Sequence, residues 1–132
     1  MTTTDRTLLA LAGLYGAAAV GLGAFAAHGM EARYGPQAVA WVETGSRYQM
    51  VHAAAMLAIA LALRVIGTGR RWLAAAGIAF AVGALVFPGT LYLLAFTGDR
   101  FWAMPAPFGG LAMIAGWLSV AAAALRGVMH RP

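Results

Sequence analysis

The sequence predicts an all-α membrane protein, a four-helix transmembrane bundle with a short interfacial helix between the first two helices. Composition is the first observation behind this prediction. Of the 132 residues, 62% are hydrophobic and only 10% are charged, and the mean hydropathy is +0.78. A soluble domain is closer to half apolar and a quarter charged. Because a chain of this size cannot hide so much apolar surface, we expect a lipid bilayer around one integral-membrane domain, residues 1–132.

Four long apolar runs are the second observation. The first holds 20 residues without a charge, which is about 30 Å as a helix and enough to span a bilayer. It also resembles a signal peptide, but its length and its regularly spaced Gly and Ala favour a retained span. Pro88-Gly89 predicts a kink in the third run. We place the spans at residues 8–27, 48–66, 72–96 and 108–125.

The arginines are the third observation, because they flank the apolar runs unequally. With four spans, one side carries three arginines offset by three acids, and the other side carries six arginines: Arg6, Arg64, Arg70, Arg71, Arg126 and Arg131. The positive-inside rule then predicts that both termini are cytoplasmic. The arginines form no basic stripe with interleaved aromatic residues, so nucleic acid is not an expected partner.

One polar-leaning segment separates the first two spans. Gly35-Pro36 breaks it, and residues 37–44 then predict a short helix lying on the membrane surface. Glu43 and Arg47 are spaced i, i+4 and are predicted to form a local ion pair.

The inventory for catalysis is small. The chain has no Cys, which excludes disulfides, thiolate metal sites and cysteine nucleophiles. Neither Ser46 nor Ser119 has a His at a recognisable motif spacing, and no zinc-protease motif occurs. The sequence therefore favours a non-enzymatic protein, and it predicts no cofactor and no metal.

Polar residues nevertheless gather at the outer end of the predicted bundle. The candidate ligand-binding residues are His28, Tyr48, Gln49, His52, Thr90 and Tyr92. Helical geometry predicts that His28 faces a neighbouring helix at a depth similar to that of His52. The alternatives for the two histidines are structural hydrogen bonds, a metal site with Glu43 as third ligand, bis-His haem ligation, and a proton-handling pair.

Small residues recur along the first span and open the fourth. They predict close helix packing, because Gly and Ala let helix backbones approach in lipid. The residues concerned are Gly13, Ala17, Gly21, Gly23, Gly109 and Gly110.

Four sequence blocks resemble a known family. They are GAFAAHG at 23–29, YQMVHA at 48–53, VFPGTLYLLA at 86–95 and PFGGLAMIAGW at 107–117. The four blocks, in this order, resemble those of the family called domain of unknown function 423. This family comprises the YgdD-like small inner-membrane proteins, and transmembrane protein 256 is a eukaryotic relative. The resemblance implies four spans, a multi-pass location in a bacterial inner membrane and no signal cleavage. It implies no activity.

These observations lead to two main hypotheses and a third. The first is a non-enzymatic membrane protein whose outer polar cluster binds or passes a small ligand, lipid or proton. The second is a structural or assembly subunit, either a homo-oligomer or part of a larger membrane complex. The third is an intramembrane protein that binds haem or a metal.

Overall fold

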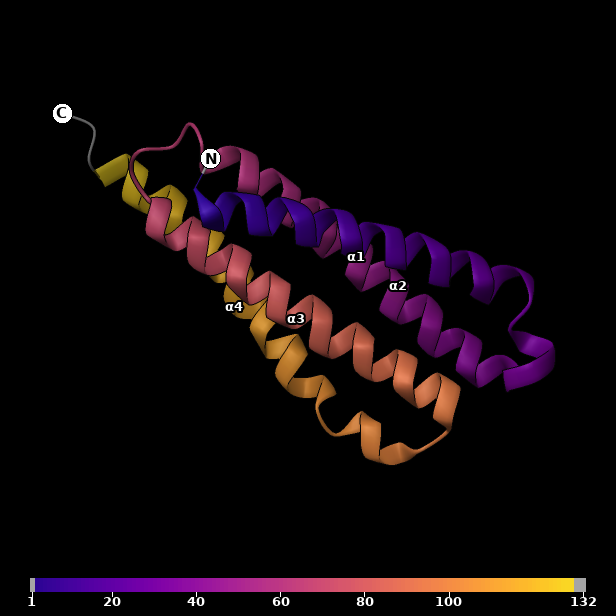
Figure 1. Cartoon of the computed structure of the whole chain (residues 1–132). Helices are drawn as coiled ribbons and strands as arrows, with labels where there is room; N and C mark the ends of the chain where they lie inside the picture. The colour runs from indigo at the N-terminus through magenta and orange to yellow at the C-terminus, as the bar shows by residue number, and fades with distance from the viewer. Residues whose placement is uncertain (1, 130–132) are drawn as a thin grey trace.

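The computed structural model describes residues 2–129, with side chains described as far as Arg126. Arg131, one of the six arginines counted above, lies outside the described residues. The chain forms four long helices and one 3-10 turn (Figure 1): α1 (Thr3–His28), α2 (Glu31–Ala62), α3 (Arg70–Thr97), η1 (Arg100–Ala103) and α4 (Ala106–Met129). The helices run alternately up and down, so the start of α1 and the end of α4 lie at one end of the molecule, the terminal end, opposite the distal end (Figure 1).

Local sequence explains where the helices begin and end. α1 begins with a capping box, in which Thr2 Oγ1 accepts from the Asp5 backbone N–H and Asp5 Oδ2 accepts from the Thr2 N–H. α3 is preceded by Gly69 (φ +80°) and followed by Gly98 (φ +68°). Both glycines are in the left-handed region that L side chains rarely adopt, which sharply limits this helix at both ends.

α2 corrects the prediction of a separate interfacial helix. Only Gly35 (φ 81°, ψ 166°) departs from helical geometry, and the helix continues without a break from Pro36 to Ala62. The apolar residues assigned to the membrane surface, such as Ala38 and Val42, are buried with Ala26 and Ala95. Residues 37–44 are therefore an internal part of α2, and their apolar side faces protein.

The helices pack in chain order and form a row. α1 lies along α2, α2 along α3 and α3 along α4, whereas α1 meets α3 at few points. α2 and α3 are therefore central, and α1 and α4 lie at the edges. The tightest approach joins α3 to α4, where a Cβ on Gly109 would lie 2.5 Å from the Phe87 backbone nitrogen and one on Gly116 would lie 2.5 Å from the Phe80 ring.

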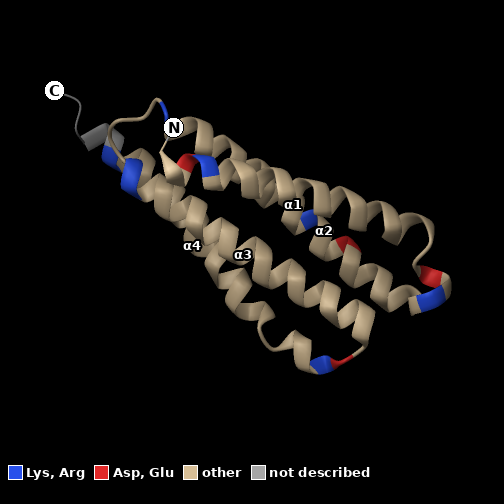
Figure 2. Ribbon diagram, viewed as in Figure 1, with Lys and Arg blue, Asp and Glu red and all other residues tan. Residues whose placement is uncertain are grey.

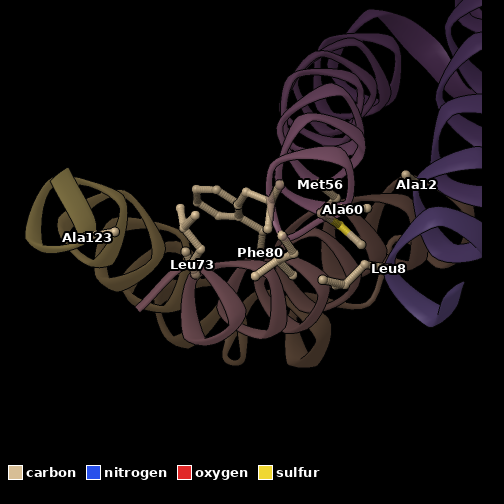
Figure 3. Packing of buried hydrophobic residues seen from close by; sticks show 10 residues of the cluster. Leu8, Ala12, Met56, Ala60, Leu73, Phe80 and Ala123 are labelled. Carbon is tan, nitrogen blue, oxygen red and sulfur yellow. The ribbon is translucent and has the colours of Figure 1, made fainter. Parts of the chain in front are cut away.

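Two apolar clusters lie near the two ends of the molecule. The terminal core, seen in Figure 3 with Phe80 near its middle, draws residues from all four helices. Its buried members are Leu8, Ala12, Met56, Ile59, Ala60, Leu63, Leu73, Ala76, Phe80 and Ala123. The distal core is smaller and consists of Ala26, Met30, Ala38, Val42 and Ala95. Along each of α1, α2 and α3, the residues between these two cores include polar side chains.

Three stretches of the described chain are long and apolar enough to cross a membrane. They are Thr3–His28, Arg70–Thr97 and Arg100–Arg126. α2 does not meet the same composition criterion, and its first half carries Glu31, Arg33, Glu43 and Arg47. Charged residues otherwise lie mainly at the two ends of the molecule (Figure 2).

Candidate functional site

A polar layer crosses the molecule between the two apolar cores. We define it by the side chains between the two cores that form hydrogen bonds from one helix to another: Tyr15, Ser46, Gln49, His52, Tyr92 and Trp117. Tyr15 Oη donates to the Ala81 carbonyl at 3.0 Å and joins α1 to α3. Ser46 Oγ donates to the Ala19 carbonyl at 2.7 Å and joins α2 to α1.

Gln49 bridges α2 and α3, and the sequence explains why its amide is needed. Pro88 has no N–H, so the carbonyl four residues earlier, at Ala84, has no intrahelical donor. Gln49 Nε2 lies 3.5 Å from this carbonyl, and Gln49 Oε1 accepts from Tyr92 Oη at 2.9 Å. The Gln49 side chain is buried. The proline that predicts a kink therefore also creates a vacant acceptor, which a neighbouring helix satisfies.

His52 is held as a neutral ring by a partner on each nitrogen. Nδ1 lies 2.7 Å from the Tyr48 carbonyl, and Nε2 lies 3.2 Å from Trp117 Nε1. An indole N–H only donates, so Nε2 accepts and the ring proton resides on Nδ1, which donates to the carbonyl. The ring also packs edge-on against Phe80, with the centroids 5.1 Å apart. His52 is therefore a buried connector between α2 and α4.

The other predicted ligand-binding residues on α2 and α3 also serve the local structure. Thr90 is buried, and its hydroxyl donates to the Val86 carbonyl of the same helix at 2.6 Å. The exposed Tyr48 packs its ring against Phe87, with the centroids 5.0 Å apart. The structure thus brings Gln49 together with Tyr92, and Tyr48 together with His52. Binding of a ligand by these residues stays a prediction.

His28 lies far from this layer. The hydrogen bond between Ser46 and the Ala19 carbonyl sets these two residues at one level. His52 lies six residues from Ser46 toward the terminal end, and His28 lies nine residues from Ala19 toward the distal end. At 1.5 Å per residue the two histidines are about 22 Å apart along the bundle. The two rings therefore cannot bind the same metal ion or haem iron.

The orientation predicted for His28 also differs from the structure, because its side chain is exposed. α1 is at the edge of the row, so the face that His28 shares with Gly13, Ala17 and Gly21 has no neighbouring helix. A Cβ on Gly13 or Gly21 would meet no atom within 4 Å. Of the other predicted packing residues, Gly23 packs against Ser46 and Gly109 against Phe87, whereas Gly110 faces open space.

A charged groove lies between α1 and α2. It has a volume of about 490 Å³. α2 contributes Glu43, Ser46, Arg47, Met50 and Val51, and α1 contributes Ala19, Val20, Gly23 and Ala24. Glu43 and Arg47 are exposed and do not form the predicted ion pair in the described structure. An exposed pair of this spacing contributes only about 0.3–0.5 kcal/mol, which explains why it need not form. The groove lies beside residues 19–24, within the uncharged run 8–27.

Sequence reasoning missed several members of the polar layer. Tyr15, Ser46 and Trp117 were not selected, although each can donate a hydrogen bond from inside an apolar helix. Pro88 was the signal for the bond that Gln49 makes. A proline leaves the carbonyl four residues earlier without its helical donor, so a donor from another helix is needed. Among residues 2–126, no group of three or more His, Cys, Asp or Glu is placed to hold a metal ion.

Apolar helices, a hydrogen-bonded interior and charges at the ends define a small helical membrane protein. The chain belongs to the family described as protein of unknown function DUF423, whose model matches residues 22–110. It is 36% identical over 134 residues to the UPF0382 inner membrane protein YgdD of Escherichia coli (strain K12), covering 96% of this chain and 98% of that protein.

Two further relatives have similar descriptions. A UPF0382 membrane protein of Haemophilus influenzae is 40% identical over 116 residues, covering 87% of this chain and 88% of its own. The UPF0382 membrane protein YwdK of Bacillus subtilis (strain 168) is 36% identical over 109 residues, covering 82% of this chain and 87% of that protein. No solved structure matches this chain.

Proposed function

We propose that the protein is a non-catalytic assembly subunit of the bacterial inner membrane, with four spans and cytoplasmic termini. In this proposal two copies pair through the charged groove between α1 and α2. The observation that carries the proposal is the exposure of Glu43 and Arg47 beside the apolar run of α1.

The course of the chain supports a fourth span. α1 ends at the distal end and α3 begins at the terminal end (Figure 1), so α2 has to return across the membrane if α1 and α3 both cross it. Residues 48–63, which include the second half of α2 and its C-cap Leu63, are uncharged and extend about 24 Å at the helical rise. Arg64 follows them directly and can extend its guanidinium to the headgroups.

The distribution of arginines supports cytoplasmic termini. The terminal end carries Arg6, Arg64, Arg70, Arg71 and Arg126, whereas the distal end carries Arg33 and Arg100 together with Glu31 and Asp99. This excess follows the positive-inside rule. A cytoplasmic reporter fused to the carboxyl terminus should be active, and activity of a periplasmic reporter there would contradict this orientation.

The polar layer favours assembly over ligand passage. Its hydrogen-bonding atoms have protein partners, several of them backbone carbonyls of other helices. No fully buried side-chain nitrogen or oxygen among the described residues lacks a partner. A ligand at this layer would first have to displace bonds that join the helices. The layer is therefore better suited to fixing the positions of the helices than to binding a changing occupant.

The groove offers what a second copy needs. Charged side chains at membrane depth usually face protein or water and pair with one another. Around a two-fold axis along the membrane normal, Glu43 of one copy can meet Arg47 of the other, and the reciprocal pair forms at the same time. The offset of four residues is about 6 Å along the helix, which an extended arginine can bridge.

The shape of the groove agrees with this pairing. Gly23 and Ala24 lie on its α1 side and offer little side-chain bulk. Small residues permit close helix approach in lipid, where packing and polar contacts drive association. The groove therefore combines low bulk with an acid and a base that complement a second copy of themselves.

A charge-exchange experiment tests the proposal. The dimer fraction is measured by native mass spectrometry in mild detergent and by single-molecule photobleaching in lipid vesicles. Glu43→Arg should lower the dimer fraction strongly, and adding Arg47→Glu to it should restore dimers. Glu31→Arg, which reverses an exposed acid at the start of α2, is the matched control and should have no effect. A monomeric wild-type protein in vesicles, or no recovery in the double variant, would contradict the proposal.

A further inference from the structure

A second cavity, at the terminal end, has a different chemistry from the groove. Its volume is about 690 Å³. The loop before α3 contributes Gly67, Thr68 and Gly69, the start of α3 contributes Arg70, Arg71, Trp72 and Ala75, and α4 contributes Arg126. Three arginines and a tryptophan therefore line one cavity at the first turn of a long helix.

We infer that this cavity binds a phosphate group at the membrane surface, carried either by an anionic lipid headgroup or by a soluble phosphate compound. The guanidinium group has donors in a planar fork that matches phosphate oxygens. Basic pockets at the cytoplasmic ends of transmembrane helices suit anionic headgroups. Neither the polar layer nor the pairing of two copies is needed for this site.

The side chain of Arg70 is held in place at the cavity by bonds within the protein. Its guanidinium donates to the Leu63 carbonyl through one terminal nitrogen, and the other lies 3.2 Å from Asp5 Oδ1. Asp5 is buried and is itself held by the capping box with Thr2. These bonds set the position of Arg70 before any anion arrives, so less side-chain freedom is lost on binding.

Arg71 supplies a charge that the described carboxylates leave unpaired. Its side chain is exposed at the cavity, and no described carboxylate forms an ion pair with it. Asp5, which pairs with Arg70, is the one acidic residue at the terminal end among residues 2–126. Among the described residues, Arg71 therefore brings positive charge to the cavity, which Arg126 also lines from α4.

The start of α3 strengthens the attraction. No described side chain caps this helix, and Gly69 precedes it with φ +80°. The Trp72 N–H donates to the Gly69 carbonyl at 3.0 Å, whereas the N–H groups of Arg70 and Arg71 precede the first intrahelical acceptor. The positive end of the helix dipole lies beside these arginines. A Cβ on Gly69 would lie 2.7 Å from the Ala123 carbonyl, so the loop is packed against α4 and the cavity wall cannot easily widen.

Trp72 indicates the depth of the cavity in the membrane. Its side chain is exposed, and the following lining residue, Ala75, is apolar. Tryptophan is enriched at the boundary between hydrocarbon and headgroups. A phosphate held by the arginines would therefore lie at headgroup level, with an apolar surface beneath it for the start of an acyl chain.

Two other arginines at the same end provide a matched control. Arg6 and Arg64 are exposed but do not line the cavity. The double variants Arg71→Gln with Arg126→Gln and Arg6→Gln with Arg64→Gln both remove two positive charges from this end. A general attraction to an anionic membrane would weaken equally in both, whereas a specific site would weaken in the first alone.

The test uses the full chain in nanodiscs of phosphatidylcholine alone or with phosphatidylglycerol. Bound phosphatidylglycerol is measured by native mass spectrometry after release, and inorganic phosphate binding is measured by calorimetry in the phosphatidylcholine discs. Losing a charge-assisted hydrogen bond should lower affinity about tenfold for Arg71→Gln. The cavity double variant should bind still less, while the control double variant should stay close to wild type. Circular dichroism should give the same helix content for all variants.

The two binding measurements, of phosphatidylglycerol and of inorganic phosphate, distinguish the source of the phosphate group. Retention of phosphatidylglycerol without binding of inorganic phosphate identifies a lipid headgroup, and binding of inorganic phosphate that displaces the lipid identifies a site open to soluble compounds. Equal loss in the two double variants, or no retained lipid and no bound phosphate in wild type, would overturn the inference.

Discussion

The contact between α3 and α4 and the outer face of α1 use the same kind of residue with opposite results. Gly83, Gly109 and Gly116 are closed by neighbours, since an added Cβ would lie within 3 Å of another atom at each. Gly13, Gly16 and Gly21 have no such neighbour within 4 Å. Small residues therefore indicate that a helix face is suited to close approach, but not which surface approaches it. In the first case the partner helix is within this chain. In the second no described helix covers the glycines, and the groove proposed for a second copy is lined by other residues of α1.

The largest effect should come from filling the closed contact. Gly109→Leu forces a side chain into the Phe87 backbone, and overpacking of this kind costs about 3 kcal/mol of the free energy of unfolding. Gly110→Leu, one residue away in open space, should change it by less than about 0.5 kcal/mol. Unfolding by a denaturing detergent, followed by circular dichroism, measures both variants. Similar losses in the two would mean that α3 and α4 do not approach as described.

An intermediate effect should separate the two histidines. His52→Leu removes the acceptor of the Trp117 N–H and the bond to the Tyr48 carbonyl, and should cost about 1–2 kcal/mol. His28→Leu alters an exposed side chain and should change stability by less than about 0.5 kcal/mol. Unfolding by a denaturing detergent, followed by circular dichroism, measures the loss of stability in both variants. A larger loss for His28→Leu would give the exposed histidine a role that its position does not explain.

The smallest effect on stability should come from the open face, together with a clear effect on association. Ala24 lies in the charged groove and its side chain is exposed. Ala24→Leu should leave the free energy of unfolding within about 0.5 kcal/mol of wild type and lower the dimer fraction in vesicles. Ala115→Leu, on the exposed side of α4, should change neither. An unchanged dimer fraction for Ala24→Leu would remove the groove from the interface.

Much of the fold followed from the sequence because lipid imposes simple requirements. Runs of about 20 apolar residues have to be helical to satisfy their backbone, and four helices were found where four runs were predicted. The family assignment also followed from the sequence and is confirmed by the match over residues 22–110. The separate interfacial helix over residues 37–44 is not confirmed, because α2 continues beyond residue 44 as far as Ala62. In the structure Gly45 accommodates the Tyr92 ring and Ser46 binds the Ala19 carbonyl.

The candidate site was harder to predict because helix order and register are tertiary properties. Periodicity gave His28 a face shared with small residues, but it did not reveal that α1 lies at the edge of a row. The sequence selected Gln49, His52 and Tyr92 as candidate site residues, yet it did not reveal that their partners are Ala84, Trp117 and one another. A polar residue inside an apolar span is therefore more safely predicted to have a partner than to bind a ligand.

Cross-linking of two copies tests the central claim most directly, because the chain contains no cysteine. Ala24→Cys introduces a single thiol into the groove, and Ala115→Cys introduces one on the exposed side of α4. After mild oxidation of native membranes, Ala24→Cys should give a disulfide-linked dimer, and the link should weaken when Glu43→Arg is added. Absence of a dimer from Ala24→Cys, or an equal amount from Ala115→Cys, would contradict pairing through the charged groove.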